Sequence, residues 1–581
     1  MIEPGRKRRW VALSIALVAI ACCVGLLSVV YRRADWPRWA LARAREASAP
    51  WNHHLYALLA RRYPALAPYL RLWAAEGALP TMDSVQALRD LAEYQPDGPV
   101  ALQAHVALAR YYADLESPET IAEYNAALAI DERTDIRLEL AWYLEDEGAT
   151  SSAYTQYLKI IDDGRHDAFV GARRTATNAL TLARDLIDRG HAYDALDALY
   201  GVADCQAYCL RAEAYRRVGQ YDDAAAMSPL CAACPDQAVA TSGQAGSSGT
   251  SEAPSAASPI DLWKETWALE ENADYAAALP IYLQVATTDS IYADDAAYRA
   301  WVLARRAGDA EASATALALL GQTQPSWLAQ RATGTLQLCI GTDYPAEAVD
   351  GLAAPVLARV SALDELGLDD LAHQELRLAA LVSEQPEMIQ RMAQELLGRG
   401  YTTEAWSLAS AYLRREACAP RAMWTLAYPR PYEELVLSSS EANGVDPALV
   451  WAVMRQESAY SPEVVSVAGA KGLMQIMPAT QSSYCQSGRA PCAPGASFVP
   501  EANIAMGAMH LRTYLDYYGG DVELAVLAYN AGPTNVDEWL ADPHVADRDD
   551  LLRLVGFGET REYLERVLRD RLIYAELYRD R

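Results

Sequence analysis

The pattern of apolar and polar residues predicts helices along almost the whole chain. From about residue 35 to 430, apolar residues recur at helical spacing within Ala- and Leu-rich stretches, and few runs alternate as a β-strand does. From residue 428 onward the pattern is again helical, with turns such as "VAGAKGLMQ", "YYGGD" and "YNAGP" between the helices. We therefore expect an all-α protein.

A short motif punctuates the first of these regions: a glycine ends a helix, and a small residue follows five positions later. Glycine, or asparagine less often, can adopt the left-handed conformation that ends a helix, and a small residue lets two helices approach closely. The motif predicts stacked helical hairpins. It resembles tetratricopeptide-like repeats with irregular spacing, so we expect a degenerate helical solenoid. A set of unrelated helical bundles is the alternative. The pairs are Gly148 with Ala153, Gly190 with Ala195, Gly219 with Ala224, Gly308 with Ser313, Gly367 with Ala372, Gly400 with Ala405, and Asn272 with Ala277.

Composition and proline positions divide the chain into segments. With 581 residues, more than one core is expected. Residues 235–258 form a Gly-, Ser-, Ala- and Pro-rich tract without periodicity, which predicts a flexible linker. The prolines of "YPRPYEELV", residues 428–436, end one helical region and precede another. We thus expect solenoid segments at 32–234 and 259–427 and a separate domain at 428–581.

The N-terminal residues predict a membrane anchor. Residues 11–31 are uncharged and almost wholly apolar, and this segment is long enough to cross a bilayer as a helix. Four basic residues, 6–9, precede it. We expect a cytoplasmic tail at 1–9 and a transmembrane signal anchor at 10–31. A lipoprotein site at Cys22 or a cleaved signal peptide is the alternative, although the apolar run continues past Cys22.

Charge and motifs exclude several classes of partner. The formal net charge of -27 would repel nucleic acid, and no basic stripe offsets it beyond the first ten residues. No glycine-rich phosphate loop precedes a lysine, so no nucleotide is expected. His510 and His544 stand alone, without a cysteine or histidine partner for a metal. We therefore expect no cofactor.

Eight cysteines lie outside the predicted span. Cys205, Cys209, Cys231 and Cys234 form a C-x3-C and C-x2-C set that suits either zinc or two disulfides, and we favour disulfides. On two antiparallel helices, Cys205 would meet Cys234 and Cys209 would meet Cys231. A further pair is expected between Cys485 and Cys492, whereas Cys339 and Cys418 have no evident partner and buried free thiols stay open for them.

The stretch "LVWAVMRQESAYSP" carries the clearest chemical signal. Asp446 followed by Pro447 predicts a helix start, with the helix continuing to about Ala459. Leu449, Val453 and Glu457 then share one face, so a carboxyl group continues a buried stripe. Burial raises the pKa of a carboxyl group and makes it a general acid. A glutamate at the solvent-exposed edge, or a buried ion pair, is the alternative.

Residues 428–581 resemble the soluble lytic transglycosylases of the lysozyme-like superfamily. The resemblance rests on four motifs in order, "ESAYSPEVVSVAGAKGLMQIMPAT", "NIAMGAMHLRTYL", "AVLAYNAGP" and "ETREYLERVL", together with the entry segment "YPRPYEELV". It implies a lysozyme-like α domain that binds peptidoglycan glycan strands. The upstream solenoid is similar, less specifically, to the helical superhelix of the larger family members.

The resemblance also implies roles for single residues. Glu457 would be the lone catalytic acid and base. It would cleave the bond between N-acetylmuramic acid and N-acetylglucosamine and leave a 1,6-anhydro ring. A two-carboxylate glycosidase would need a second Asp or Glu about 5 to 10 Å away, and the motifs contain no convincing partner. The residues expected at the substrate are Ser466, Gly472, Met474, Gln475, Tyr529, Asn530, Glu559 and Tyr563, with bracing of the C-terminal helix as the alternative for the last two.

These features together predict a cell-wall enzyme. We expect a lytic transglycosylase anchored in the inner membrane and facing the periplasm, with peptidoglycan as its substrate. The helical solenoid offers a surface for other cell-wall proteins. The alternatives are a lysozyme-type hydrolase, which needs an activated water, and a non-catalytic scaffold that only binds glycan strands.

Overall fold

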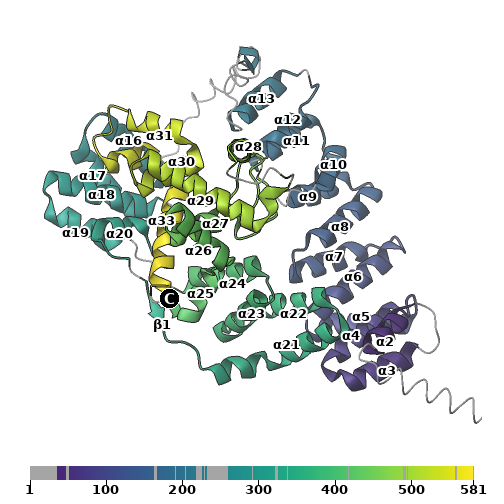
Figure 1. The fold of residues 1–581 in the computed structure, drawn as a ribbon. Helices are drawn as coiled ribbons and strands as arrows, with labels where there is room; N and C mark the ends of the chain where they lie inside the picture. The colour runs from purple at the N-terminus through teal and green to yellow at the C-terminus, as the bar shows by residue number, and fades with distance from the viewer. Residues whose placement is uncertain are drawn as a thin grey trace, which may run out of the picture. The chain divides into compact units, whose positions relative to one another are not determined.

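The computed structural model of the chain describes residues 36–579, except 47–51, 162–165, 190, 203, 218–225, 228, 232–258, 289, 291, 321–324, 337, 417, 467, 489–492, 494 and 556–558. Helices account for most of these residues (Figure 1). The predicted tail, the anchor at 10–31 and the linker at 235–258 lie outside the described residues. The chain forms two compact units, one from residues 1–231 and 347–388 and one from residues 232–346 and 389–581.

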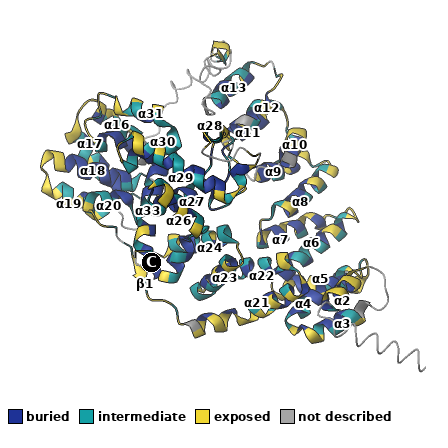
Figure 2. Ribbon diagram, in the orientation of Figure 1, coloured by how far each residue is buried: buried dark blue, intermediate teal, exposed yellow. Residues whose placement is uncertain are grey.

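The first unit is a stack of antiparallel helices. Consecutive helices pack on each other, as α5 does on α6, α8 on α9 and α11 on α12, and α22 returns to pack on α6. Figure 2 shows the resulting division of each helix into buried and exposed faces. Its helices are α2 (Trp36–Arg45), α3 (Asn52–Arg62), η1 (Pro64–Leu66), α4 (Ala67–Glu76), α5 (Met82–Tyr94), α6 (Pro99–Ala113), α7 (Glu119–Ile130), α8 (Thr134–Asp146), α9 (Thr150–Ile161), α10 (His166–Thr175), α11 (Ala179–Asp188), α12 (Ala192–Ala198), α13 (Cys205–Arg217), α21 (Ala346–Leu366) and α22 (Asp369–Leu381).

The glycine motif marks helix ends as expected at four described positions. Gly148, Gly308, Gly367 and Gly400 are all left-handed. The alanines that follow Gly148, Gly367 and Gly400 by five residues are fully buried. Gly190, Gly219 and Ala224 lie outside the described residues, whereas Ala195 is described and fully buried. The small residues Ala153, Ala372 and Ala405 therefore support the predicted helical hairpins.

The asparagine version of the motif needs a correction of one residue. Asn272 is not left-handed; Ala273 is, with φ 57°. Five positions later, Ala278 is fully buried, while the predicted Ala277 is half-buried. The side-chain amide of Asn272 instead donates a 2.8 Å hydrogen bond to the carbonyl of Ala268, one turn earlier in the chain. The chain thus turns one residue later than predicted.

The second unit is built around its last helix, α33. Helix α33 packs against α27, α30, α20, α25 and α32. The elements of this unit are α16 (Pro259–Glu271), α17 (Tyr275–Ala286), α18 (Ala293–Ala307), α19 (Ala310–Leu319), α20 (Trp327–Thr333), β1 (Ile340–Gly341), α23 (Pro386–Gly398), which begins at the boundary, α24 (Thr402–Arg415), β2 (Ala419–Pro420), α25 (Arg421–Ala427), α26 (Glu433–Asn443), α27 (Pro447–Ser458), α28 (Pro478–Gln486), η2 (Ala496–Phe498), α29 (Pro500–Tyr517), α30 (Val522–Ala531), α31 (Pro533–Leu540), α32 (Arg548–Val555) and α33 (Glu559–Leu577).

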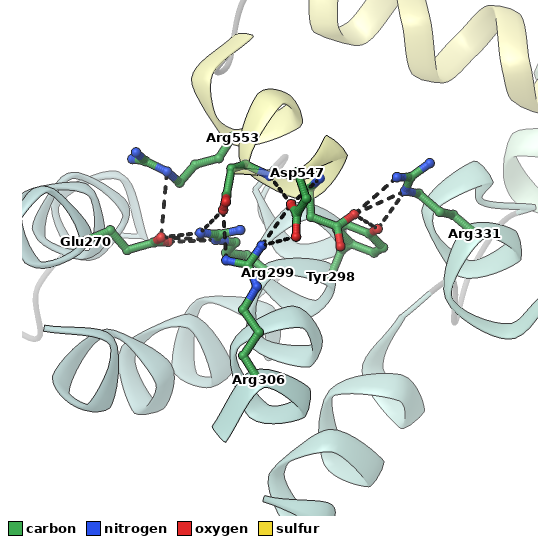
Figure 3. Close-up of polar contacts among 9 residues, drawn as sticks. Glu270, Tyr298, Arg299, Arg306, Arg331, Asp547 and Arg553 are labelled. Atoms are coloured by element: carbon green, nitrogen blue, oxygen red, sulfur yellow. Dashed lines mark hydrogen bonds and ion pairs between the residues drawn. The ribbon is translucent and has the colours of Figure 1, made fainter. Parts of the chain in front are cut away.

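A buried ion-pair network joins α16 and α18 to α32 (Figure 3). Arg299 donates to Glu270 at 2.8 Å and lies 3.2 Å from Asp550, and Arg306 donates to the same oxygen of Asp550 at 2.8 Å. The side chains of Glu270, Arg299 and Asp550 are almost completely buried. Buried charges persist in proteins when they are paired, so these contacts require the helices to stay together.

Two further contacts extend this attachment. Tyr298 donates a 2.7 Å hydrogen bond to Asp549, which Arg331 also reaches (Figure 3). Arg561 of α33 pairs with Asp295 of α18, and both side chains are buried. Residues 259–346 and 389–427 belong to the same compact unit as the C-terminal helices. The predicted domain boundary at residue 428 stays a prediction.

The structure pairs a set of cysteines that only partly follows the sequence pattern. Cys209 is bonded to Cys231. Cys205 is also in a disulfide, and so, separately, is Cys485. Cys234 and Cys492 lie outside the described residues. Cys339, for which the sequence indicates no partner, is bonded to Cys418. The adjacent parallel pairing of β1 with β2 brings these two segments together, although 79 residues separate the cysteines.

Among the helices that the structure describes, none combines the length and the apolar character that crossing a bilayer requires.

Candidate active site

Helix α27 presents Glu457 near its C-terminal end. The carboxylate of Asp446 accepts a hydrogen bond from the backbone N–H of Ala448 at 2.9 Å, and Pro447 occupies the first turn, as the sequence predicts. Leu449 and Val453 are fully buried, so the face of the helix that they share with Glu457 is turned toward the interior. The helix ends at Ser458, and Glu457 is half-buried at the wall of a cavity.

Tyr563 orients the carboxyl group. Its hydroxyl donates a 2.6 Å hydrogen bond to Oε1 of Glu457. Burial, together with the nearby charge of Glu457, holds the pKa of Tyr563 well above its usual value of 10. The phenol therefore stays protonated near neutral pH and acts as a donor. Helix α33 thus fixes the position of Glu457 on α27.

Tyr529 is a second tyrosine close to Glu457 and lies near the end of α30. Its hydroxyl donates a 2.8 Å hydrogen bond to the carbonyl of Met474. Burial and then the charge of Glu457 raise the pKa of Tyr529 well above 10, which places this ring within electrostatic reach of the carboxyl group. Tyr529 therefore connects the loop that contains Met474 to the surroundings of Glu457.

The loop after α27 folds back on itself. Isolated β-bridges join Val465 to Lys471 and Lys471 to Ile476. The Ser466 hydroxyl accepts from the backbone N–H of Ala470 at 3.0 Å, so its contact here is within the turn. The Gln475 amide donates to the carbonyls of Val464 and Gly472 at 3.1 and 2.9 Å.

Gly472 is required by both conformation and space. Its φ is +75°, and a Cβ there would lie 2.1 Å from the carbonyl oxygen of Ser497 and 2.6 Å from the amide nitrogen of Asn503. The fully buried Asn503 donates to the Lys471 and Ser497 carbonyls and accepts from the Met474 N–H. Any side chain at position 472 would displace the Asn503 amide. The backbone of Gly472 thus comes close to Asn503 and Ser497, which is the contact that needs a glycine here.

Met474 needs a correction. Its side chain is predicted from the sequence to contact a sugar, but the residue is fully buried. Its Cβ and Cγ occupy the space where a side chain at Gly507 would lie, so α29 covers it. The thioether therefore contributes to packing, and only the backbone of Met474 is part of the hydrogen-bonded loop.

The last two predicted residues connect α30 to the start of α33. The side-chain oxygen of Asn530 accepts a 2.7 Å hydrogen bond from the Thr560 hydroxyl. Glu559 is the first residue of α33, and its side chain is outside the described part of the structure. Its role at the substrate stays a prediction.

Glu457 lines a cavity of about 620 Å³ between α24, α25, α27 and α33. Trp406, Trp424, Tyr428 and Ile573 give it an apolar wall. Among the described residues that line this cavity, Glu457 is the only carboxylate. Within the described residues no cluster of His, Cys, Asp and Glu suited to a metal ion is found.

Arg455 does not neutralise Glu457. Its guanidinium lies 2.9 Å from the carboxylate of Asp570, and Gln456 and Arg569 also donate to that carboxylate. Burial would raise the pKa of Asp570, but Arg455 and Arg569 beside it lower the pKa below its usual value, so the carboxylate is ionised. The ion pair proposed as an alternative use for Glu457 is therefore made by Asp570.

His510 is part of an aromatic cluster behind Tyr529. Its ring lies 4.6 Å from Tyr514 and 5.3 Å from Tyr529, centroid to centroid, and Nδ1 is 3.0 Å from the Tyr484 hydroxyl. Burial lowers the pKa of His510 to about 4, so the imidazole is neutral near pH 7. His544, in contrast, is exposed and pairs with Asp542.

Sequence reasoning missed two groups of residues at this site. Asn503 is the first residue of the "NIAMGAMHLRTYL" motif, and its place in that motif was the available signal. Arg414, Arg566 and Arg569 line the cavity, but nothing in the local pattern separates them from ordinary surface arginines.

Comparison with known proteins agrees with this geometry. Residues 434–551 match the family model of the Transglycosylase SLT domain, so the chain carries a domain of this family. The soluble lytic murein transglycosylase of Salmonella typhimurium is 32% identical over 282 residues, which are 47% of this chain and 42% of that protein. This chain thus spans less than half the length of that relative. A transglycosylase of Enterobacteria phage PRD1 is 41% identical over 106 residues, 18% of this chain and 36% of the phage protein.

The fold resembles that of a solved structure over almost its whole length. The X-ray structure of an inactive mutant of the lytic transglycosylase Slt from Pseudomonas aeruginosa aligns with a TM-score of 0.57. The alignment covers 94% of this chain and 96% of that chain at 17% sequence identity. At this identity the likeness concerns the fold.

Proposed function

We propose that the chain is a lytic transglycosylase that cleaves the β-1,4 bond between N-acetylmuramic acid and N-acetylglucosamine in peptidoglycan. The observation that carries the proposal is the position of Glu457. Its carboxyl group is oriented by Tyr563 and lines a cavity in which no other carboxylate is among the described lining residues. The Transglycosylase SLT domain match and the murein transglycosylases among its relatives support the substrate class.

In the proposed reaction Glu457 acts first as an acid and then as a base. It gives its proton to the glycosidic oxygen, the bond from C1 of the muramoyl sugar to that oxygen breaks, and the N-acetylglucosamine side leaves as an alcohol. The C6 hydroxyl oxygen of the same muramoyl sugar bonds to C1, and its proton returns to Glu457. The product is a 1,6-anhydro sugar, and no water is consumed.

The single carboxylate favours an internal nucleophile. A glycosidase that uses two carboxylates places the second about 5 to 10 Å from the first, as nucleophile or as base for water. Asp570, an ionised carboxylate that pairs with Arg455 and Arg569, is fully buried and so is not available for this role. A hydroxyl supplied by the substrate replaces the missing group.

The disulfides support an oxidising location. The chain contains the disulfides Cys209–Cys231 and Cys339–Cys418, and such bonds are typical of proteins outside the reducing cytoplasm. Peptidoglycan also lies outside the cytoplasm. We therefore place the chain in the periplasm. The inner-membrane anchor at 10–31 and the binding of cell-wall proteins by the solenoid stay predictions.

The proposal is tested by cleavage of purified peptidoglycan with the full chain. Glu457→Gln keeps the shape of the side chain but removes its proton transfer, so the rate should fall about a thousandfold. Glu441→Gln, which neutralises an exposed glutamate of α26, serves as the control and should keep the full rate. A Glu457→Gln variant that solubilises glycan at the wild-type rate would rule out this enzyme activity.

A further inference from the structure

Four arginines line the cavity that contains Glu457. Arg414 comes from α24, Arg455 from α27, and Arg566 and Arg569 from α33. This gathering contrasts with the chain as a whole, whose formal net charge is -27. The cavity is therefore a locally basic region within an acidic protein.

The charges of these arginines are only partly compensated. Arg455 and Arg569 share the single carboxylate of Asp570, which leaves one positive charge between them. Arg566 pairs with Glu562 one turn away, and about half of each side chain is exposed. An exposed pair of this kind is weak and is easily exchanged for another anion.

Arg414 adds a second uncompensated charge. It is exposed at the end of α24, and within the described residues no carboxylate pairs with it. Before Glu457 is counted, the cavity and its ion-pair partners thus have an excess of two positive charges. Arg566 lies one turn beyond Tyr563 on α33, so this excess is close to the carboxyl group that Tyr563 orients.

Guanidinium groups bind carboxylates strongly and with defined geometry, so these arginines suit a ligand that carries a carboxylate. Trp406, Trp424, Tyr428 and Ile573 give the same cavity an apolar wall.

We infer that Arg414 and Arg566 bind a carboxylate carried on the lactyl side chain of the muramoyl sugar, in substrate held next to Glu457. This inference rests on the proposed function and names the part of the substrate that the cavity recognises. The carboxylate has two chemical sources. It is either a carboxylate of the peptide attached to the lactyl group, or the lactyl carboxylate itself on strands without peptide.

The test measures binding in the Glu457→Gln background, so that the ligand is not consumed. Three glycan fragments serve as ligands: one with its peptide carboxylates intact, one with those carboxylates amidated, and one without peptide. The double variant Arg414→Gln with Arg566→Gln is compared with Arg579→Gln. Arg579 is an exposed arginine that follows α33 and does not line the cavity, which makes it the matched control.

We expect the double variant to weaken binding of the fragment with intact peptide carboxylates about tenfold and binding of the amidated fragment less than twofold. A tenfold loss confined to the peptide-free fragment would assign the lactyl carboxylate as the ligand. Equal affinities for the variant and the control on all three fragments, with thermal unfolding unchanged, would overturn the inference. Cleavage by the otherwise wild-type chain is measured in parallel, and its absence would refute the proposed function instead.

Discussion

The hydroxyl of Tyr563 donates a 2.6 Å hydrogen bond to Oε1 of Glu457, although 106 positions separate the two residues. The bond joins the last helix of the chain to the helix that presents the candidate catalytic carboxyl group. Because Tyr563 is buried, this contact has a fixed direction. It explains why α33, which packs against so much of the second unit, matters for the chemistry.

Tyr563→Phe removes this hydrogen bond and little else. We expect kcat for glycan cleavage to fall about tenfold, because the hydrogen bond to the carboxyl group contributes about 1.5 kcal/mol to its orientation. Initial rates on defined glycan strands check this. Tyr518→Phe, which removes a phenol bonded to Asp537 away from the cavity, should leave kcat unchanged. Equal rates for both variants and wild type would contradict the orienting role.

Gly472→Ala should destabilise the protein strongly. The new Cβ would overlap the Ser497 carbonyl and the Asn503 amide, and the left-handed backbone is unfavourable for alanine as well. We expect a loss of about 3 kcal/mol or more in the free energy of unfolding, measured by denaturant titration.

The control for this prediction is Gly469→Ala in the same loop. Gly469 is also left-handed, but no atom lies within 4 Å of its would-be Cβ, so only the backbone cost of about 1 kcal/mol applies. A similar loss for the two variants would show that the space around Gly472 is not limiting.

Arg299→Met should weaken the attachment of α18 to α32. The substitution leaves the carboxylates of Glu270 and Asp550 buried without their main partner, which costs about 3 to 5 kcal/mol. Calorimetry of the full chain would record a lower unfolding temperature. Arg305→Met, on the same helix, loses only an exposed contact with the ring of Trp301 and should cost less than about 1 kcal/mol. Matching unfolding temperatures for the two variants would count against the network.

His510 predicts a pH dependence of stability. Its pKa is lowered to about 4 in the folded protein, from 6.5, because burial disfavours the charged ring. As pH falls below about 6.5, the unfolded chain gains a proton that the folded chain does not take up until about pH 4. Stability is therefore lost across this window, by up to about 3 kcal/mol.

His510→Gln removes this contribution. Denaturant unfolding at pH 7, 5.5 and 4.5 should show a shallower decline for the variant than for the wild type. Because all other titrating groups are shared, the difference between the two slopes reports on His510. Parallel curves would mean that the imidazole titrates normally in the folded protein.

Local features of the fold could be predicted from the sequence, and long-range contacts could not. Asp446 and Pro447 identify the start of α27 because capping depends on neighbouring residues. The spacing of Leu449, Val453 and Glu457 gave the correct face for the same reason. The glycine motif succeeded at Gly148 and Gly400, whereas at Asn272 it failed by one residue because Ala273 takes the left-handed conformation instead.

The contacts that complete the site join distant residues. The Tyr563–Glu457 bond and the Asn503 contacts with the glycine loop have no local pattern, and family resemblance alone suggested that Tyr563 lies near the substrate. The Cys339–Cys418 bond depends on the pairing of β1 with β2, which are too short to recognise as strands. Met474 was assigned to the substrate, whereas burial places it in the core.

The central claim is that Glu457 transfers the protons while the C6 hydroxyl of the muramoyl sugar attacks C1 of the same sugar. Mass spectrometry of the ends produced when the full chain digests peptidoglycan tests this most directly. We predict muramoyl ends that are one water lighter than reducing ends, formed by the wild type and not by Glu457→Gln. Reducing muramoyl ends from the wild type would contradict the account, because they require attack by water.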